Sequence, residues 1–190
     1  MMAAQKKMTY AEYMAFEEAS VEKHEFLDGE VFAMAGGTLE HSALAVAFAV
    51  ALVKAIGDRP CRVFNSDLRV RIPPTGLTTY PDLSVACGKA ELDGEDSHAL
   101  VNPVLIVEVL SDSTEAYDRG QKAAHYRHID SLKEYALVSQ HGPRIEVFRR
   151  NEAGRWELYE YERGASCELA SVGVSVSVDD VYRDPLAGVA

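Results

Sequence analysis

Two periodicities of hydrophobic and polar positions run along the chain, one typical of strands and the other of helices. Residues 104–110 (Val-Leu-Ile-Val-Glu-Val-Leu) are apolar on both faces except at Glu108, as in a central strand that is covered on both sides. The alternation in a second apolar region slips at Asn65-Ser66, which predicts a bulge or bend there. Shorter patterned runs predict further strands or turns, at residues 61–72, 80–87, 134–139, 144–150, 156–161 and 175–182.

The N-terminal part of the chain carries two local signals of defined structure. Thr9 and Glu12 can form a capping box, in which each side chain accepts from a free backbone N–H of the other residue, so a short helix is expected to begin there. Asp28-Gly29 lies between two apolar-bearing runs and is the preferred chemistry of a tight hairpin turn with positive φ. We therefore expect a helix followed by a β-hairpin over residues 25–34.

Two further helices are expected in the body of the chain. Thr38 can cap an alanine-rich stretch that Gly57 closes, and because this stretch is apolar on nearly all sides we expect it to be largely enclosed. Its apolar run, residues 43–53, is shorter than the roughly 20 residues that cross a bilayer, so no membrane association is expected. Residues 118–129 read as the second helix. Helices that alternate with strands favour an α/β or α+β fold with a mixed sheet.

Length and cysteine usage limit the organisation of the chain. With 190 residues and 47% hydrophobic content it can bury one substantial core, so we expect a single domain over residues 1–190. The three cysteines, Cys61, Cys87 and Cys167, form no CxxC pair and are odd in number, which suits a reducing cytosol better than a disulfide framework. The first ten residues lack the apolar run of a secretory signal, so a cytoplasmic location is expected.

The charge balance argues against a protein that coats nucleic acid. Thirty acidic and nineteen basic side chains give a formal net charge of −11, which repels phosphate at long range. A site that carries its own positive charge can still act on a phosphate, because charges beyond a Debye length of about 8 Å are screened. The charge therefore excludes general coating but leaves open a local phosphate-directed site.

Two acidic residues on neighbouring predicted strands are the strongest candidates for chemistry. Glu108 lies inside an apolar strand, where an uncompensated carboxylate costs several kcal/mol or more, so it needs a cation or hydrogen-bond donors. Asp82 lies one strand earlier, after Pro81, at a position typical of the start of a strand. If the two carboxylates converge, their repulsion is relieved by a hard divalent cation such as Mg²⁺ or Mn²⁺.

The next predicted helix supplies a cationic partner. Lys122 lies in this helix, and Tyr126 four positions later shares its face. A lysine beside a carboxylate-held metal can stabilise developing negative charge or orient a water for attack on phosphorus. A Glu108–Lys122 pair can equally be a structural ion pair, and it is Asp82 that favours the metal site over that interpretation.

The combination of these residues resembles a known nuclease family. Asp82, the Glu108-Val109-Leu110-Ser111 segment and Lys122 with Tyr126 resemble the restriction-endonuclease-like family of the PD-(D/E)XK nuclease superfamily. The similarity runs from about residue 10 to 182, and its strongest block is residues 102–127. It implies an αβββαβ core, here with an N-terminal helix and hairpin and a C-terminal β-hairpin extension. It further implies divalent-metal-dependent cleavage of DNA, with Mg²⁺ as cofactor, Asp82 and Glu108 as its ligands, and often a homodimer.

One position departs from the superfamily pattern. Leu110 occupies the third position of the Glu108-Val109-Leu110 motif, where a catalytic lysine is normally found. The resemblance implies that this lysine has moved to the following helix, where Lys122 is the matching candidate. Arg119 is close enough in the sequence to leave the choice open.

The resemblance also suggests supporting residues and leaves alternatives. His41 matches an N-terminal acid-or-histidine position that assists metal binding in related nucleases. Glu25 and Glu30 are weaker candidates for the same role. Tyr126 is a weaker candidate for contact with the site. Basic residues on the helix and a later hairpin could contact phosphates, although such clusters are usually solvated faces. Two other functions remain: a catalytically idle nuclease-fold module for nucleic-acid binding or dimerisation, and a hydrolase of small phosphodiesters.

Overall fold

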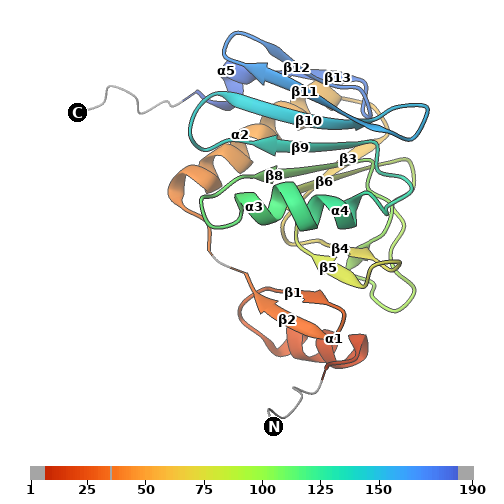
Figure 1. Ribbon diagram of the computed structural model, residues 1–190. Helices are drawn as coiled ribbons and strands as arrows, with labels where there is room; N and C mark the ends of the chain where they lie inside the picture. Colours follow the sequence, from red (N-terminus) through yellow and green to blue (C-terminus); the bar gives the residue numbers. More distant parts are fainter. Residues whose placement is uncertain (1–6, 35, 184–190) are drawn as a thin grey trace.

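The computed structural model describes residues 7–34 and 36–183, which form a mixed α+β fold (Figure 1). Most of the first ten residues, on which the expectation about secretion rests, lie outside the described part of the chain. A six-stranded sheet has the order β11-β10-β9-β8-β6-β3. Its strands are β3 (Cys61–Asn65), β6 (Leu83–Cys87), β8 (Leu105–Val109), β9 (Glu134–Val138), β10 (Arg144–Arg150) and β11 (Trp156–Glu162).

Smaller sheets and helices complete the architecture. A five-stranded sheet has the order β2-β1-β5-β4-β7, and a separate hairpin pairs β12 with β13. Their strands are β1 (His24–Leu27), β2 (Glu30–Ala33), β4 (Arg69–Ile72), β5 (Leu77–Thr79), β7 (Ala99–Leu100), β12 (Ser166–Leu169) and β13 (Val174–Ser177). The helices are α1 (Tyr10–Ala19), α2 (Leu39–Ile56), α3 (Glu115–Tyr117), the π-helix η1 (Asp118–Lys122), α4 (Ala123–Tyr126) and α5 (Val178–Val181).

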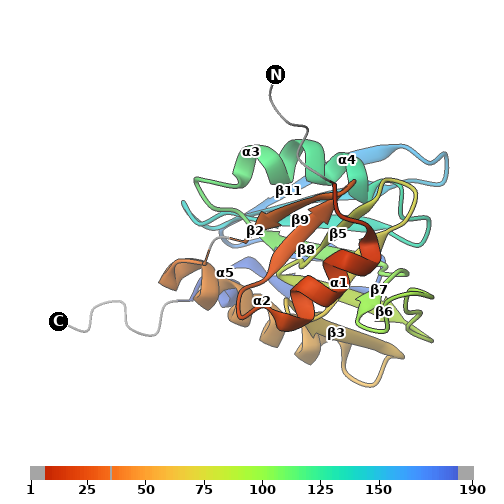
Figure 2. The same cartoon turned by 90° about the horizontal axis from the view of Figure 1, so that it is seen from below.

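The six-stranded sheet is covered on both faces, as the apolar pattern of its central strand predicts. Helix α2 lies behind the sheet and the α3–η1–α4 segment lies in front of it (Figures 1 and 2). Alternate residues of β8 point to opposite faces of the sheet. Leu105, Val107 and Val109 belong to the core on the α2 side, whereas Ile106 belongs to the core with α4. Glu108 has the same strand phase as Ile106 and therefore faces the α3–η1–α4 segment.

The N-terminal helix and hairpin are confirmed. Thr9 and Glu12 form the complete capping box at the start of α1. Asp28 and Gly29 have φ values of 47° and 92° and join β1 to β2, which are antiparallel and in register from His24 opposite Ala33 onward. The hairpin also pairs with β5, so it extends the five-stranded sheet.

The expected bend at Asn65-Ser66 is a change of sheet. Strand β3 ends at Asn65 and pairs with β6 in the large sheet, whereas β4 begins at Arg69 and pairs with β5 and β7 in the other. The single strand expected over residues 61–72 is therefore two strands. Three short strands, β5, β7 and β12, have too few residues to produce a readable alternation and were not expected.

The expectation that the alanine-rich helix is enclosed is wrong. Helix α2 begins and ends as predicted, with Thr38 as its N-cap and Gly57 as its C-cap. Its four largest inward side chains are buried in the core, but valines on its outer face are more than half exposed. The whole helix, Leu39–Ile56, is also long and apolar enough by length and composition to cross a membrane, although its inner face packs on the sheet.

The expectation of three free cysteines is also wrong. Cys61 and Cys87 form a disulfide, and only Cys167 among the described cysteines is free, as a buried thiol. The two partners are 26 residues apart in the sequence and become neighbours because β3 and β6 pair in the register that sets Cys61 directly opposite Cys87. Sequence spacing alone does not reveal such a cross-strand pair.

Candidate metal centre

Asp82 and Glu108 come together at the same end of two neighbouring strands. Strands β6 and β8 are antiparallel, and Leu83 pairs with Val107, so one step further along the ladder Asp82 faces Glu108. The backbone N–H of Asp82 donates to Glu108 Oε2 at 3.2 Å, and the backbone N–H of Val109 donates to Asp82 Oδ2 at 2.7 Å. The backbone of each strand thus donates to a carboxylate of the other, which holds the two acids beside one another.

Glu108 is buried and densely contacted. Its side chain is 5% exposed; Oε1 accepts from the hydroxyl of Tyr126 at 2.7 Å and lies 3.0 Å from Lys122 Nζ. Burial raises the pKa of Glu108 to about 8, Lys122 and the Tyr126 hydrogen bond oppose that rise, and the nearby carboxylates of Asp82 and Asp118 add to it. The pKa is therefore raised mainly because burial removes water from the carboxylate, and the neighbouring acids contribute less to the rise.

Lys122 occupies the centre of a group of carboxylates. It lies at the end of η1, and its ammonium is 3.2 Å from Glu25, 3.0 Å from Glu108 and 3.3 Å from Asp118. Burial alone lowers the pKa of a lysine, but these three acids raise the pKa of Lys122 well above its usual value. The π-helical turn is a rare conformation that is frequent at functional sites, and here it directs Asp118 and Lys122 to the same side.

Glu25 reaches the cluster from the N-terminal hairpin. It lies on β1, where Thr79 of β5 donates to Oε1 and Tyr117 of α3 donates to Oε2 at 3.1 Å. Because these donors come from separate elements, the hairpin, the small sheet and the helical segment all hold the Glu25 carboxylate in place beside Lys122.

Asp118 is the cluster member that the sequence reasoning missed. Its side chain is 4% exposed, it contacts Lys122, and burial raises its pKa. The signal was available, since an aspartate four residues before a lysine lies on the same helical face. The helix was expected to begin at residue 118, but α3 begins at Glu115, so Asp118 lies inside the helical segment instead of at its exposed start.

His41 joins Asp82 from the other layer of the protein. It lies in the first turn of α2, and its Nε2 is 3.1 Å from Asp82 Oδ2. Hydrogen bonding to Asp82 raises the pKa of His41, and the charges of Glu108 and Asp118 add to the effect. The two layers that cover the large sheet therefore meet at the Asp82–Glu108 edge.

The cluster carries an excess of negative charge. Glu108, Glu25 and Asp118 surround one ammonium, Lys122, and Asp82 lies beside Glu108, so full ionisation of the four acids leaves three uncompensated negative charges, or two if His41 is protonated. Oxygen ligands and net negative charge are what Mg²⁺ and Mn²⁺ prefer. Among the described residues no group of three or more His, Cys, Asp or Glu side chains is placed to hold a metal ion, so the cluster offers an ion at most two protein ligands, for which Asp82 and Glu108 are the candidates.

Several other candidates lie outside the cluster. Glu30 is exposed at the start of β2, opposite Leu27. Arg119, the rival of Lys122, forms ion pairs with Glu115 at 2.7 Å and Glu146 at 2.5 Å. The structure thus brings Lys122 and not Arg119 to Glu108, while the catalytic and metal-binding roles of the cluster stay predictions.

The basic residues of the later hairpin have structural partners. Arg149 pairs with the buried Glu134 at 2.7 Å. Arg150 donates to backbone carbonyls, at 2.7 Å in the case of Arg127, and lies over the ring of Trp156. These contacts occupy both guanidinium groups within the protein, so the hairpin does not offer them as free phosphate ligands.

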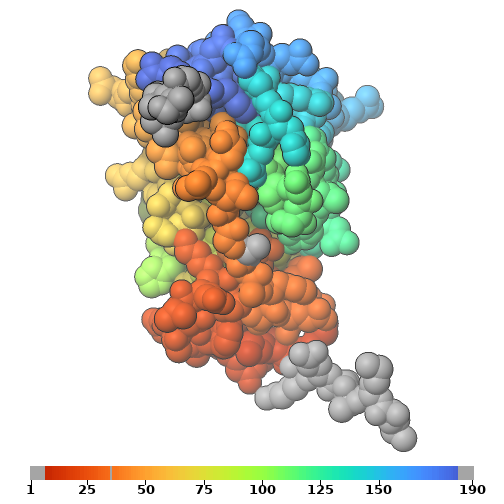
Figure 3. All heavy atoms as spheres, turned by 90° about the vertical axis from the view of Figure 1, so that its left-hand side faces the viewer, coloured from red at the N-terminus to blue at the C-terminus, as the bar shows by residue number. Residues whose placement is uncertain are grey.

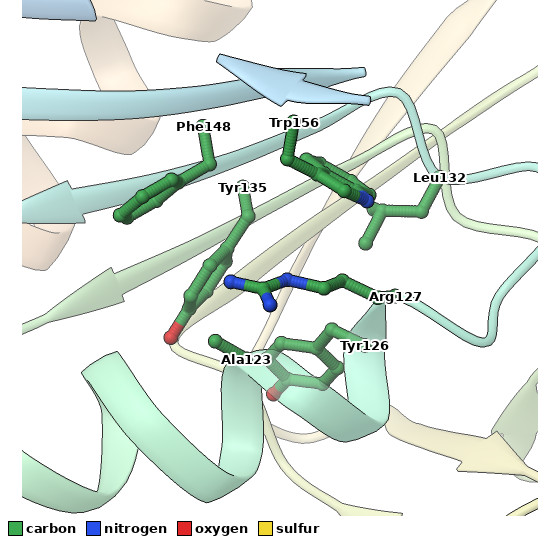
Figure 4. A pocket seen from close by; sticks show the side chains of 7 residues that line it. All are labelled: Ala123, Tyr126, Arg127, Leu132, Tyr135, Phe148 and Trp156. Carbon is green, nitrogen blue, oxygen red and sulfur yellow. The ribbon is translucent and has the colours of Figure 1, made fainter. Parts of the chain in front are cut away.

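An aromatic pocket next to the cluster is closed to ligands. It is bounded in part by the ring of Tyr126, the residue that donates to Glu108. Figure 4 shows the side chain of Arg127 crossing it, with the guanidinium group toward Tyr135 and the ring of Trp156 on one side. The cavity has essentially no volume for a water molecule, so Tyr126 is packed in place.

Comparison with protein families identifies the chain. A sequence profile described as "Putative restriction endonuclease", that of the Uma2 family, matches residues 10–179. The chain belongs to the Uma2 family. The Uma2 chain is 39% identical over 177 residues to the uncharacterized protein slr1290 of Synechocystis sp., covering 93% of this chain and 92% of that protein. It is 36% identical over 159 residues to a second uncharacterized protein of that organism, sll1609, covering 84% and 90%.

A solved structure supports the fold of this Uma2 chain. A crystal structure described as a "putative nuclease belonging to DUF820", from Anabaena variabilis, matches it with a TM-score of 0.74. The match covers 92% of this chain and 97% of the other at 17% sequence identity, so it shows the fold alone. The restriction-endonuclease-like fold expected from the sequence resemblance is confirmed by the family and by this structural neighbour.

Proposed function

We propose that this Uma2 protein is a divalent-metal-dependent endonuclease that hydrolyses phosphodiester bonds in DNA. The observation that carries the proposal is the excess of acidic side chains, in which Glu108, Glu25 and Asp118 surround the single ammonium of Lys122 and Asp82 lies beside Glu108. Glu134, a buried acid with a structural role, shares its guanidinium partner only with the exposed Glu168, whereas Lys122 is shared by three buried carboxylates. Such a cluster favours an added cation, and membership in a family whose description reads "Putative restriction endonuclease" favours DNA as the substrate.

The residues present fit Mg²⁺, with Mn²⁺ able to substitute. Asp82 and Glu108 supply hard oxygen ligands from neighbouring strands, and a Mg²⁺ site of one or two carboxylates normally retains several waters. When bound, the ion supplies positive charge that polarises a phosphoryl oxygen and increases the acidity of a coordinated water.

The protein groups around the ligands each have a distinct task. Lys122 remains an ammonium among its acids, so it donates hydrogen bonds to the negative charge that develops on the phosphate. Tyr126 fixes the Glu108 carboxylate through its hydroxyl, and His41 fixes that of Asp82. Glu25 and Asp118 hold Lys122 in position.

Two features of the whole protein belong to the same proposal. Cutting both strands of a duplex at once needs two sites, so the active form is a two-fold symmetric homodimer. With a net charge of −11 the protein meets DNA through its metal sites and not through general attraction. The cytoplasm is its proposed location.

Cleavage of supercoiled plasmid DNA tests the proposal. Purified protein with Mg²⁺ or Mn²⁺ should nick and linearise the plasmid, and EDTA should abolish cleavage. Asp82→Ala and Glu108→Gln should each reduce the rate by at least about a hundredfold, because a ligand of the ion is lost. Glu152→Gln, an exposed acid in the β10–β11 turn, is the matched control and should cleave like the wild type.

Calorimetric titration with Mn²⁺ separates the alternatives. Binding that disappears in Glu108→Gln supports the metal site, while no binding to either protein would mean a catalytically idle scaffold. Equal cleavage by wild type and Asp82→Ala would identify a contaminating nuclease and refute the proposal. Turnover of a small phosphodiester without DNA cleavage would replace DNA by a small substrate.

A further inference from the structure

Helix α2 has two apolar faces, and only one of them belongs to the core. The inner face carries Leu44, Phe48, Leu52 and Ile56, which are at most 3% exposed and recur every four residues. Figure 3 shows the other side of the helix as an orange column at the surface of the molecule. The outer residues, here called the α2 seam, are all apolar and exposed: Leu39, Ala43, Val46, Val50 and Val53.

The spacing of the α2 seam is that of a helix-pairing surface. Its residues follow one another at intervals of four, three, four and three, the a/d repeat by which two helices pack along their length. Leu39 is 94% exposed, and Val46, Val50 and Val53 are 61%, 62% and 56% exposed. Valine is a weaker helix former than alanine because its side-chain rotation is restricted, so nothing in the isolated chain favours three valines at exposed helical positions.

The charges beside the α2 seam indicate what covers it. Besides His41, whose ring is bound to Asp82, the helix has two charged residues, Glu40 in its first turn and Lys54 in its last. At 100° per residue they lie on the same flank of the seam. When a second α2 packs antiparallel to the first about a two-fold axis, the same flank of both helices lies at one side of the contact. The N-terminal end of one helix is then beside the C-terminal end of the other, so each Glu40 lies opposite a Lys54. A parallel helix would not bring these opposite charges together.

We infer that the α2 seam is the contact surface for a second copy of this chain, whose own α2 packs against it in antiparallel orientation. In the alignment of the two helices that pairs Glu40 with Lys54, Val46 of each copy contacts Val50 of the other at the centre of the interface. Ala43 of each copy lies against Val53 of the other on either side of that centre. The small side chain of Ala43 permits close approach of the helices there. The surface is self-complementary in shape and charge, as a two-fold interface requires.

A lipid bilayer is a poorer fit to the same surface. Helix α2 cannot leave the protein without exposing Phe48 and Leu52, which are fully buried. A helix that lies on a membrane normally carries several basic residues along its polar face, but α2 has only Lys54, and the chain has a net charge of −11. Anionic membranes would therefore repel the protein and offer its Glu40 no partner, whereas a second α2 sets a Lys54 opposite each Glu40.

The inferred surface extends the homodimer of the proposed function and connects it to the candidate metal centre. His41, the partner of Asp82, lies on α2 between the seam residues Leu39 and Ala43 in sequence. A dimer through α2 would therefore brace the helix that holds Asp82 and would fix the separation of two cutting sites. The test measures association and not cleavage, so the dimer surface and the nuclease activity can fail independently.

Sedimentation velocity and light scattering of the full chain test the inference, without metal or DNA. From micromolar to hundred-micromolar concentration the wild type should have twice the 20.8 kDa chain mass. Val50→Lys, and Val46→Lys with Val50→Lys, should weaken association by about a hundredfold or more, since a buried apolar contact is replaced by charge. Val21→Lys changes a fully exposed valine outside the seam and should leave the dimer intact.

Charge reversal distinguishes antiparallel self-pairing from every other occupant. Glu40→Lys alone and Lys54→Glu alone should each weaken the dimer by about three- to thirtyfold, because each places like charges opposite one another twice. The double variant should recover the wild-type affinity. Its melting temperature should nevertheless stay low, because both new charges oppose the helix dipole, so the recovery cannot come from general stabilisation.

Three results would overturn the inference. One is a monomeric wild type throughout the concentration range. Another is a dimer that Val50→Lys leaves unchanged while circular dichroism shows a folded protein, which would put the interface elsewhere. The last is flotation of the wild type, but not of Val50→Lys, with vesicles of neutral or anionic phospholipid, which would make a bilayer the occupant.

Discussion

Two buried glutamates of the large sheet, Glu134 and Glu108, have opposite surroundings. Glu134 at the start of β9 is fully buried, yet Arg149 donates to it at 2.7 Å and the backbone N–H groups of Ala170 and Ser171 donate at 3.1 and 2.8 Å. Those donors tie the turn between β12 and β13 to the sheet. Glu108 is equally inaccessible, but it shares its one ammonium with other carboxylates.

The difference shows that burial of an acid does not by itself mark a functional site. Glu134 has backbone donors and a guanidinium that it shares only with an exposed acid, Glu168, so its environment needs nothing from outside the protein. The Glu108 cluster lacks positive charge, and burial raises the pKa of Glu108 to about 8. The imbalance of charge, rather than the depth of burial, makes Glu108 the candidate for metal binding.

The largest loss of stability should come from removing Glu134, the glutamate whose charge the protein itself neutralises. Glu134→Ala leaves Arg149 without its buried partner and frees the N–H groups that hold the β12–β13 turn, so unfolding in urea should lose about 3–5 kcal/mol. Glu168→Ala is the control, because this partner of Arg149 is exposed and its loss should cost less than about 1 kcal/mol. Mn²⁺ binding should be unchanged in both. A loss below about 1 kcal/mol in Glu134→Ala would remove the contrast between the two glutamates.

The sequence predicted elements that depend on local signals. The Thr9 capping box, the Asp28-Gly29 hairpin and the apolar strand around Glu108 are each specified by neighbouring residues, and all three are observed. Pairings between distant segments were not predictable in this way. The Cys61–Cys87 disulfide depends on the register of two strands, and the exposure of α2 depends on which of its two apolar faces meets the sheet.

The residues of the candidate site also differ in how far the sequence alone revealed them. Glu108 could be singled out because a charge in an apolar run is visible in the sequence, and Lys122 and Asp82 followed from it. Asp118 was missed although its spacing from Lys122 is a local signal, because the helix was expected to begin at residue 118 and the structure begins it at Glu115, which places Asp118 inside the segment. Glu25 and Glu30 were predicted together as weaker candidates for assisting the metal, but the hairpin leaves Glu30 exposed while Glu25 reaches Lys122.

The pH dependence of stability should separate the two glutamates next. Folding raises the pKa of Glu108 from 4.5 to about 8, so between these values the folded metal-free protein binds more protons than the unfolded one, and its stability falls as pH rises. One such group contributes a slope of up to about 1.4 kcal/mol per pH unit. Melting temperatures in EDTA from pH 5 to 8 should therefore fall more steeply in the wild type than in Glu108→Gln.

The comparison with Glu108→Gln isolates this one group. Asp118 and His41 also have raised pKa values that make stability fall as pH rises, and both residues are present in both proteins; the part of the His41 shift that the Glu108 charge causes is removed together with Glu108. Gln keeps an acceptor for Tyr126 and Lys122, so the variant should fold. If the melting temperatures of the two proteins fall in parallel as pH rises, ionisation of Glu108 does not cost stability. The proposal that the cluster needs an added cation would then lose its basis.

The smallest effect should come from removing the Tyr126 hydroxyl, which donates to Glu108. Tyr126→Phe removes the 2.7 Å hydrogen bond to Glu108 Oε1 from a ring that is fully buried, so stability should fall by about 1–2 kcal/mol. Mn²⁺ affinity should fall by about tenfold, because a carboxylate that loses its orienting donor is a poorer ligand. Tyr135→Phe is the matched control, since that buried hydroxyl donates to the backbone carbonyl of Asp118 and not to a carboxylate. It should cost similar stability and leave Mn²⁺ affinity intact. An equal change of affinity in the two variants would trace the effect to general loosening of the aromatic layer and not to Glu108.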